Sequence, residues 1–284
     1  MNVLVTGAGG FSGGNIVKYF AACGYQVTGT YRTRKPEEEK NCTFIRQELS
    51  EEIHIEGHFD AIIHTSCAHR GSFQICKRDN VDSMERLISF ARENQIGTII
   101  NFSTRSIYGT ISRQEIFEES ERTDPDYYGI TKYSAECLLR DAADINGMSL
   151  RLPGVSGPGA HNIWLVNTVN KFIANEPVTI SDFQTRNFVW IFDIAAFIDK
   201  LLHDVQAGKK FKYNAVNLAC KEEASNIDIA NEIKRRTRSE SEICVVPQGN
   251  GLFTLRADKA FEMGFEPHTP MEIVDLYLDT LNLR

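Results

Sequence analysis

A glycine-rich turn near the start of the chain constrains the fold more than any other feature of the sequence. The apolar run at residues 3–6 predicts a β-strand, and the spacing of apolar residues over 11–23 predicts an amphipathic helix. The turn between them reads Thr-Gly-Ala-Gly-Gly-Phe-Ser-Gly, and glycines at this spacing permit a tight turn, close approach to a pyrophosphate and close helix packing. Because a helix N-terminus is positive and has free N–H groups, we expect phosphate to bind at Gly7, Gly10, Phe11, Ser12 and Gly13. The alternative is a glycine turn that binds nothing.

Strand and helix patterns alternate through the first half of the chain. Further strands are expected at residues 26–31, 61–64, 98–102 and 149–152, and helices at residues 79–93 and 126–144. Repeated β–α alternation predicts a parallel sheet with helices on both faces. We therefore expect an α/β protein with a Rossmann-type doubly wound parallel sheet and a small C-terminal α/β substrate-binding part.

A Gly- and Pro-rich stretch at residues 153–159 interrupts this alternation and marks the expected boundary. Residues 1–153 are interpreted as a dinucleotide-binding Rossmann domain. Residues 154–284 are interpreted mainly as a substrate-binding part, with segments at about 186–218 returning to the Rossmann core. Helices are expected in this second part at residues 164–175, 193–203, 226–236 and 271–281, with strands at residues 178–180 and 214–218.

The end of the second predicted strand indicates which dinucleotide binds. A NAD site usually has an acidic side chain about twenty residues beyond the glycine loop, where it holds the ribose 2′-hydroxyl. No residue from 14 to 36 is acidic, and the strand ends instead in Tyr31, Arg32, Thr33 and Arg34. Guanidinium groups form bidentate, charge-assisted contacts with phosphate, so these residues favour NADP over NAD. In the alternative, Arg32 and Arg34 lie on a surface loop and NAD binds without its usual anchor.

Charge and cysteine content exclude several classes of partner. The 284 residues carry a formal net charge of −7 at pH 7, which favours binding neither to nucleic acid nor to an anionic membrane. The seven cysteines include no CxxC pair, so no metal site is expected and a reducing cytoplasm is the simplest location. No apolar run is long enough for a membrane span or an export signal. We therefore expect a cytoplasmic protein.

Tyr128 and Lys132 lie four residues apart in the helix expected at residues 126–144, which places both side chains on one face. The strand that precedes this helix ends in Phe102, Ser103 and Thr104. A tyrosine has an ordinary pKa of about 10, so it needs positive charge nearby to exchange a proton readily at neutral pH. Lys132 could supply that charge. The alternative is that both side chains only cover a helix surface.

Taken together, these motifs resemble the extended short-chain dehydrogenase/reductase superfamily, in its nucleotide-sugar-modifying branch. The resemblance spans nearly the whole chain. Its further motifs are His64 to Ala68, Asn80 with Val81, Ser103 and Thr104 before Ile107 to Gly109, Leu150 to Leu152, and Arg186 to Val189.

The resemblance implies a role for each matching residue. Tyr128 would be the general acid/base, Lys132 would bind the nicotinamide ribose, and Thr104 would orient the substrate oxygen, with Ser103 as the alternative. Besides the glycine loop, Tyr31, Arg32 and Arg34, the expected cofactor contacts are Glu48, Leu49, Thr65, Ser66, Cys67, Asn80, Phe102, Ser103, Tyr128, Lys132, Leu152 and Pro153.

The family contains nucleotide-sugar epimerases, dehydratases and reductases, and the residues after Thr104 discriminate among them. Dehydratases place Asp-Glu there, whereas this chain has Arg105 and Ser106, which argues against dehydration. The expected substrate contacts are Thr104, Arg105, Asn162 and Arg186. Arg186 would face a substrate diphosphate, and the alternative is a surface residue that starts a strand. His161 could act as an epimerising base, and the alternative is a loop histidine with no catalytic role.

NADP preference favours reduction of a nucleotide-linked keto-deoxysugar, with Tyr128 as the general acid. A reductase draws on NADPH, whereas an epimerase keeps NAD bound and returns its hydride. A nucleotide-sugar 4-epimerase with the same catalytic residues is the alternative, and a non-catalytic NADP sensor is a third. By resemblance alone, the helices at residues 79–93 and 126–144 would pair across a two-fold axis in a homodimer.

Overall fold

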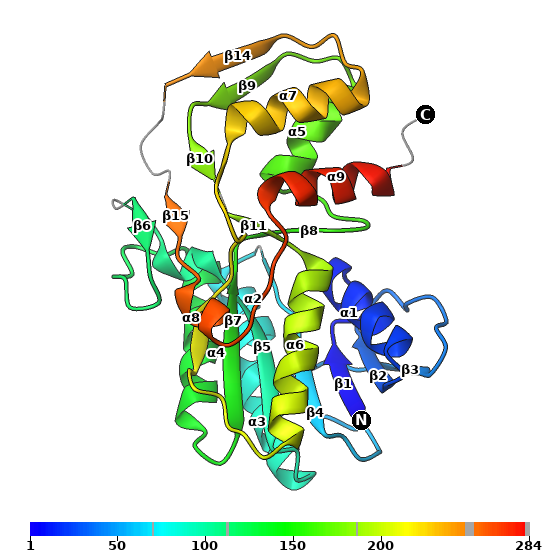
Figure 1. The fold of residues 1–284 in the computed structure, drawn as a ribbon. Coiled ribbons are helices and arrows are strands. Elements are labelled where there is room, and N and C mark those ends of the chain that lie inside the picture. Colours follow the sequence, from blue (N-terminus) through cyan, green and yellow to red (C-terminus); the bar gives the residue numbers. More distant parts are fainter. Residues whose placement is uncertain (70, 112–113, 186, 248–252, 282–284) are drawn as a thin grey trace.

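A seven-stranded parallel sheet forms the centre of the molecule (Figure 1). The computed structural model describes residues 1–69, 71–111, 114–185, 187–247 and 253–281. The strand order is β12-β7-β5-β4-β1-β2-β3, and each neighbouring pair is parallel. The strands are β1 (Asn2–Thr6), β2 (Gln26–Tyr31), β3 (Cys42–Arg46), β4 (Ala61–His64), β5 (Thr98–Thr104), β7 (Asn146–Leu152) and β12 (Ala215–Asn217). This arrangement confirms the predicted doubly wound Rossmann-type fold.

The two faces of the sheet have separate apolar cores because side chains alternate along each strand. Val3 and Val5 of β1 belong to one core, and Leu4 between them belongs to the other. In β5, Ile100 and Ile99 divide between the two cores in the same way. All residues of β4 and β5 are buried, as expected for parallel strands covered on both sides.

Helices cover both faces of the sheet. The helices α1 (Phe11–Ala22) and α6 (Ile191–Gln206) pack together over one face, with apolar residues of both in its core. The helices α3 (Ser83–Glu93) and α4 (Tyr127–Asp141) cover the other face. A short helix α2 (Phe73–Cys76) and the π-helix η1 (Lys77–Asp82) lead into α3. The helix expected from residue 79 therefore begins as π-helix before it becomes regular.

The strand β3 at the edge of the sheet was not predicted. Its five residues are partly buried or exposed, unlike those of β4 and β5. It pairs in parallel with β2 on one side only. An edge strand with this exposure lacks the continuous apolar run by which a buried strand is found in a sequence.

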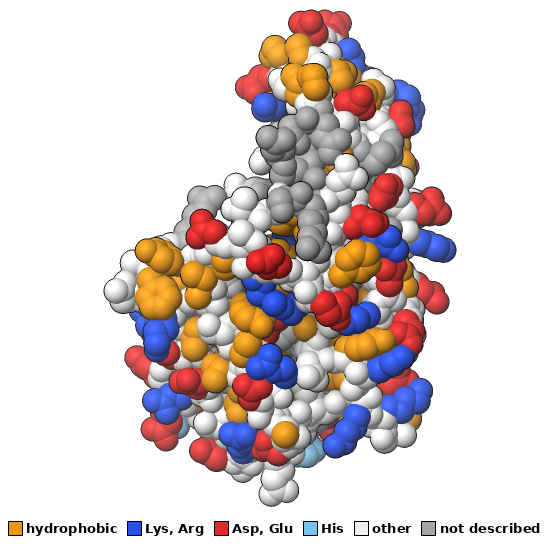
Figure 2. Space-filling view, turned by 90° about the vertical axis from the view of Figure 1, so that its left-hand side faces the viewer, with side chains coloured by type: hydrophobic (Ala, Val, Ile, Leu, Met, Phe, Trp, Pro, Cys, Tyr) orange, Lys and Arg blue, Asp and Glu red, His pale blue; other side chains and the backbone are white. Residues whose placement is uncertain are grey.

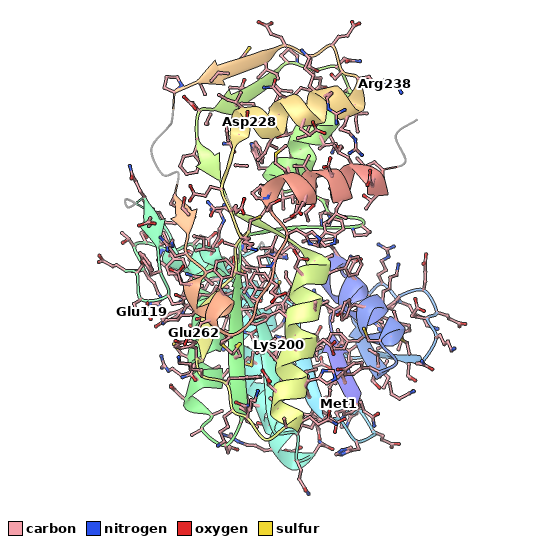
Figure 3. All side chains as sticks on the ribbon, in the orientation of Figure 1. Met1, Glu119, Lys200, Asp228, Arg238 and Glu262 are labelled. Carbon is pink, nitrogen blue, oxygen red and sulfur yellow. The ribbon has the colours of Figure 1, made fainter. Side chains whose placement is uncertain are left out.

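The C-terminal part of the chain forms a smaller layer beyond the carboxyl ends of the strands, at the top of Figure 1. Its core is formed mainly by α5 (Trp164–Ile173), α7 (Asn226–Thr237) and α9 (Pro270–Thr280), which pack beneath the parallel pair β9 (Val178–Ser181) and β14 (Ile243–Val246). Side chains fill the space between these helices (Figure 3). The smaller elements are β8 (Gly154–Ser156) paired with β11 (Phe188–Trp190), β10 (Gln184–Thr185) with β13 (Ala224–Ser225), β6 (Glu115–Ile116) with β15 (Thr254–Leu255), the 3₁₀ helix η2 (Arg105–Tyr108), and α8 (Asp258–Glu262).

The chain passes between the two parts more than once. After α5 and β9 it returns along β11 into α6, and then enters the sheet again as β12 at the edge beside β7. Figure 2 shows the narrower C-terminal part above the broader sheet domain, with acidic and basic side chains mixed over the face in view. No helix in the described ranges has the length and apolar character needed to cross a membrane.

Candidate active site

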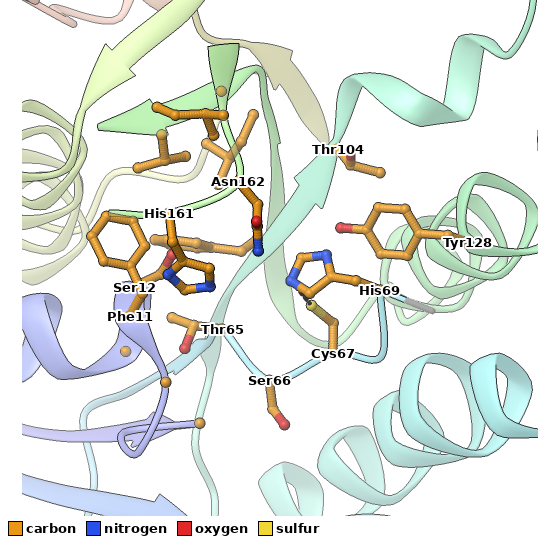
Figure 4. Close-up of a pocket in the computed structure, with 18 of the residues that line it drawn as sticks. Phe11, Ser12, Thr65, Ser66, Cys67, His69, Thr104, Tyr128, His161 and Asn162 are labelled. Atoms are coloured by element: carbon orange, nitrogen blue, oxygen red, sulfur yellow. Dashed lines mark hydrogen bonds between the residues drawn. The ribbon is translucent and has the colours of Figure 1, made fainter. Parts of the chain in front are cut away.

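A cavity of about 1130 Å³ lies at the carboxyl ends of the sheet strands, between the sheet and the C-terminal part (Figure 4). It extends from the glycine loop after β1, past the ends of β2, β4, β5 and β7, to residues 161–165 and to Ser181, Phe183, Asn187 and Phe188. The strand order changes direction between β1 and β4, and ligands of doubly wound sheets bind at such a switch point. The location alone therefore marks this cavity as the candidate active site.

The glycine loop fits the pyrophosphate of a dinucleotide. A Cβ atom on Gly13 would come within 2.3 Å of the Gly7 carbonyl oxygen, and a Cβ on Gly7 within 2.9 Å of the Ser66 nitrogen. Gly7 also has φ +76°, a conformation that favours glycine. No side chain caps α1 at Gly10, and its first turn has no acidic residue. The N–H groups at this helix start are therefore available to a phosphate.

The two predicted phosphate-binding arginines have different surroundings. Arg32 donates to Asp79 at 2.8 Å and lies 3.6 Å from Glu48. Asp79 also accepts from Arg78 at 2.6 Å, and the two guanidinium groups outweigh burial and hold its carboxyl pKa below the usual value. Arg34 lines the same cavity and forms no ion pair with any described residue. A structural partner thus already holds Arg32, whereas Arg34 is available to a ligand.

The loop after β4 brings a thiol and an imidazole to the cavity. The Cys67 sulfur lies 3.4 Å from His69 Nε2, and the ring of His69 is 5.1 Å from that of Tyr128 between centroids. Burial favours the neutral thiol, but the hydrogen bond with His69 and the charge of Lys132 together lower the pKa of Cys67. No role was predicted for His69, because the motif recognised after this strand runs only from His64 to Ala68.

Local contacts place Tyr128 beside Thr104. Asp126 caps α4 by accepting from the Gly129 nitrogen at 2.7 Å. Gly129 lets the helix approach η2 closely, since a Cβ there would lie 2.3 Å from the Ser106 carbonyl oxygen. In Figure 4 the Tyr128 hydroxyl points toward the region between Thr104 and His69. The predicted tyrosine and threonine therefore meet at one wall of the cavity.

Burial controls the protonation of this pair of helix residues. It raises the pKa of Tyr128 well above the ordinary value, and a hydrogen bond with Thr104 only partly opposes the rise. We expected the charge of Lys132 to lower the pKa of Tyr128. In the protein without its cofactor, the effect of burial on this pKa is larger. Lys132 is 1% exposed, and burial lowers the pKa of its own ammonium group. Tyr128 accordingly stays protonated at neutral pH.

A buried polar network beneath the site escaped the sequence interpretation. Arg151 donates to both oxygens of Glu136, at 2.7 Å for the shortest contact, and also to the Tyr108 hydroxyl at 3.0 Å. The Ser103 hydroxyl donates to Glu136 as well. Because this hydrogen bond holds Ser103, Thr104 is the better placed of the two to contact a substrate oxygen.

Most of the predicted site residues line this one cavity. Asn80 and Lys132 are not in its lining: Asn80 is fully buried and bonds to the backbone of Ala68 and to Thr131, where it holds the loop after β4. Arg186 lies outside the described residues. Lining residues that had no predicted role come mainly from the C-terminal part: His69, Asp79, Trp164, Phe183, Asn187, Phe188 and Asn226. Asn187 and Phe188 belong to the motif at residues 186–189, in which only Arg186 was assigned a contact; the others belong to no recurring motif, so only the fold reveals them.

Metal chemistry has no evident site here. Within the described ranges, no three His, Cys, Asp or Glu side chains come together as metal ligands.

Comparison with known proteins identifies the family. The model of the NAD dependent epimerase/dehydratase family matches residues 3–219. The chain belongs to this family. It is therefore an enzyme of the extended short-chain dehydrogenase/reductase type, with a nicotinamide dinucleotide as its cofactor.

The proteins similar to this chain include a reductase and a glycan biosynthesis protein, and a similar fold occurs in an epimerase. The chain is 28% identical over 265 residues to a dTDP-4-dehydro-6-deoxy-D-allose reductase from a Streptomyces species, covering 81% of this chain and 79% of the reductase. It is 23% identical over 311 residues to the low-salt glycan biosynthesis protein Agl12 of Haloferax volcanii, covering 98% and 99%. The fold matches UDP-glucuronic acid 4-epimerase from Bacillus cereus with a TM-score of 0.80 at 20% identity, covering 99% of this chain and 96% of the epimerase.

Proposed function

We propose that the protein is an NADP-dependent reductase of a nucleotide-linked keto-deoxysugar. The observation that carries the proposal is the meeting of Tyr128 and Thr104 at one wall of a cavity that begins at a dinucleotide-binding loop. A tyrosine hydroxyl at this place can donate a proton to a carbonyl oxygen. Arg105 and Ser106 stand where a dehydratase would need acidic groups. The likeness to a keto-deoxysugar reductase supports the same reaction.

The choice of NADP rests on the arginines after β2. Arg34 offers a guanidinium without an ion-pair partner among the described residues, and Arg32 stands beside it at the same end of the cavity. Guanidinium groups suit the 2′-phosphate that distinguishes NADP from NAD. The chain from residue 14 to 36 offers no carboxylate for a free 2′-hydroxyl.

In the mechanism the protein positions the ketone and delivers a proton. When bound, the reduced nicotinamide supplies a hydride to the carbonyl carbon. Thr104 orients the carbonyl oxygen by hydrogen bonding, and Tyr128 donates its hydroxyl proton to that oxygen as the alkoxide forms. Lys132, buried one helical turn from Tyr128, would hold the nicotinamide ribose and would supply positive charge to the site.

The cofactor state tests this proposal directly. The purified protein is heated, any released nucleotide is identified, and the protein is titrated separately with NADPH and NADH. We expect exchangeable NADPH, bound more tightly than NADH and weakened by Arg34→Ala or Arg32→Ala. Tightly retained NAD would instead favour a nucleotide-sugar 4-epimerase.

The replacement Tyr128→Phe tests the catalytic role. It removes the proton donor and leaves the ring, so turnover of a nucleotide-linked ketosugar should fall by about 100-fold or more while NADPH binding stays the same. Steady-state kinetics and a fluorescence titration measure the two effects. Unchanged turnover would exclude Tyr128 as the acid. A wild-type protein that binds NADP without turnover would support a sensor.

The same proposal includes location and assembly. We propose a cytoplasmic homodimer in which α3 and α4 pair across a two-fold axis. All seven cysteines are free thiols, which suits a reducing compartment. Light scattering on the purified protein measures the assembly state.

A further inference from the structure

Arg105 lies at the point where the catalytic strand end meets the C-terminal part. It is the first residue of η2 and directly follows Thr104, and its side chain lines the cavity. Its guanidinium carbon lies 5.2 Å from the centroid of the Phe253 ring. Asn187, another lining residue, holds the backbone here by donating to the Phe253 carbonyl oxygen and accepting from the Leu255 nitrogen at 2.9 Å. Arg105 therefore lies where the wall of the cavity passes from the end of β5 to the C-terminal part.

No described carboxylate neutralises Arg105. The carboxylates that line the cavity are Glu48 and Asp79, and both lie against Arg32 at the opposite end. Arg105 forms no hydrogen bond or ion pair with any described residue, although its side chain is exposed to the cavity. Protein atoms around the guanidinium partly desolvate it and lower its pKa, and no acidic group opposes this shift. Arg105 nevertheless keeps its charge at neutral pH.

Arg151, the other arginine at this strand end, already has its partners. It is buried and paired with Glu136 through several hydrogen bonds. Arg105 is instead exposed to the cavity, with no carboxylate beside it. The stacking of Arg105 on Phe253 orients the side chain and leaves its N–H groups for another partner.

We infer that Arg105 binds an anionic group of the substrate, either a phosphate of the nucleotide or a carboxylate on the sugar. Each presents paired oxygens that match the planar N–H groups of a guanidinium. The inference rests on the proposed function in one respect, that the substrate is a nucleotide sugar. It adds a cationic subsite directly beside the reacting group.

Binding measurements test the subsite without requiring turnover. NADPH-loaded wild-type protein and Arg105→Gln are titrated with thymidine, dTMP and dTDP by calorimetry, and in parallel with uridine, UMP and UDP. If the group is a phosphate, Arg105→Gln weakens binding of the diphosphate by about tenfold or more and leaves nucleoside binding unchanged. Arg105→Lys, which keeps the charge, should restore part of the loss.

A second pair of probes, UDP-glucuronate and UDP-glucose, tests whether the anionic group is a carboxylate on the sugar. If the group is a carboxylate, wild-type protein binds UDP-glucuronate more tightly than UDP-glucose, and Arg105→Gln abolishes this preference while binding dTDP and UDP normally. Arg140→Gln is the matched control, because Arg140 is exposed on α4 and paired with Asp141 outside the cavity. NADPH titration and the melting temperature verify that each variant is folded.

The outcomes separate the subsite from the proposed function. Equal binding of every probe by wild-type protein and Arg105→Gln would overturn the subsite and leave the reductase proposal standing. Loss of nucleotide binding with Arg105→Gln in a protein that never reduces a ketosugar would support the subsite and reject the reductase. Wild-type protein that binds none of the probes would overturn both.

Discussion

At the scale of single residues, the cofactor end of the cavity holds competing charges. Asp79 is buried, lines the cavity and accepts from both Arg32 and Arg78. A 2′-phosphate on the cofactor must therefore compete with this carboxylate for Arg32. Arg34, with no ion pair to a described residue, carries no such competition.

The replacement Asp79→Asn should tighten NADPH binding by about three- to tenfold and change NADH binding little. It keeps the shape of the side chain but removes the charge that holds Arg32, and only NADPH has the phosphate that benefits. Fluorescence titration with each cofactor measures the effect. Asp82→Asn is the control, since Asp82 lies on the same helical segment and pairs with Lys77. An equal shift for both cofactors would contradict the explanation.

At the scale of secondary structure elements, the approach of α4 to η2 determines the catalytic geometry. The helix start at Asp126 and the small size of Gly129 bring Tyr128 close to the end of β5. The Ser106 carbonyl oxygen occupies the space that a larger residue at position 129 would need. The position of the tyrosine is thus set by helix packing as much as by the Tyr-x3-Lys spacing.

The replacement Gly129→Ala should lower turnover by about tenfold or more, with a smaller effect on NADPH binding. The added Cβ forces the start of α4 away from η2, and a small displacement of a catalytic group is costly in rate. Steady-state kinetics and cofactor titration measure the two effects. Gly97→Ala is the matched control, because a Cβ there meets open space. Equal turnover by the two variants would show that the close packing of α4 against η2 does not control the rate.

The sequence was sufficient for elements and motifs whose signal is local. The glycine loop, the buried strands and the Tyr128 helix each have a periodicity or spacing that can be read over a few residues. The edge strand β3 lacks such a pattern. The contact between Arg105 and Phe253 joins residues 148 positions apart by number, and Arg32 meets Asp79 across 47 positions. Contacts of this kind depend on the tertiary fold and leave no local mark.

At the scale of the whole molecule, stability in acid depends on a histidine at the centre of the sheet. His64 at the end of β4 is fully buried and its Nδ1 lies 2.7 Å from the Thr6 hydroxyl oxygen. Burial, with a smaller contribution from Lys132, lowers the pKa of His64 to about 3. The unfolded chain has an ordinary histidine pKa of about 6.5 and therefore takes up a proton first as the pH falls.

This histidine should make the free energy of unfolding decrease by about 1.4 kcal/mol per pH unit below pH 6.5, down to the folded pKa. Its contribution is present in full above pH 6.5. Urea unfolding at pH 7 and pH 5 measures the slope, and His64→Gln should reduce it. His203→Gln, at an exposed position of α6, should leave it unchanged. A slope that is the same in all three proteins would exclude His64 as the cause.

The late return of α6 and β12 to the sheet bears on how the protein is made. A ribosome that has released only the first 153 residues has delivered neither the helix that packs on α1 nor the strand beside β7. The nascent chain would expose the apolar surface that α6 later covers, and one edge of β7, until about residue 217 has emerged. Such surface invites aggregation or chaperone binding during synthesis. For the cell, the cofactor-binding part of this enzyme therefore cannot be completed until about half of the remaining chain has been translated.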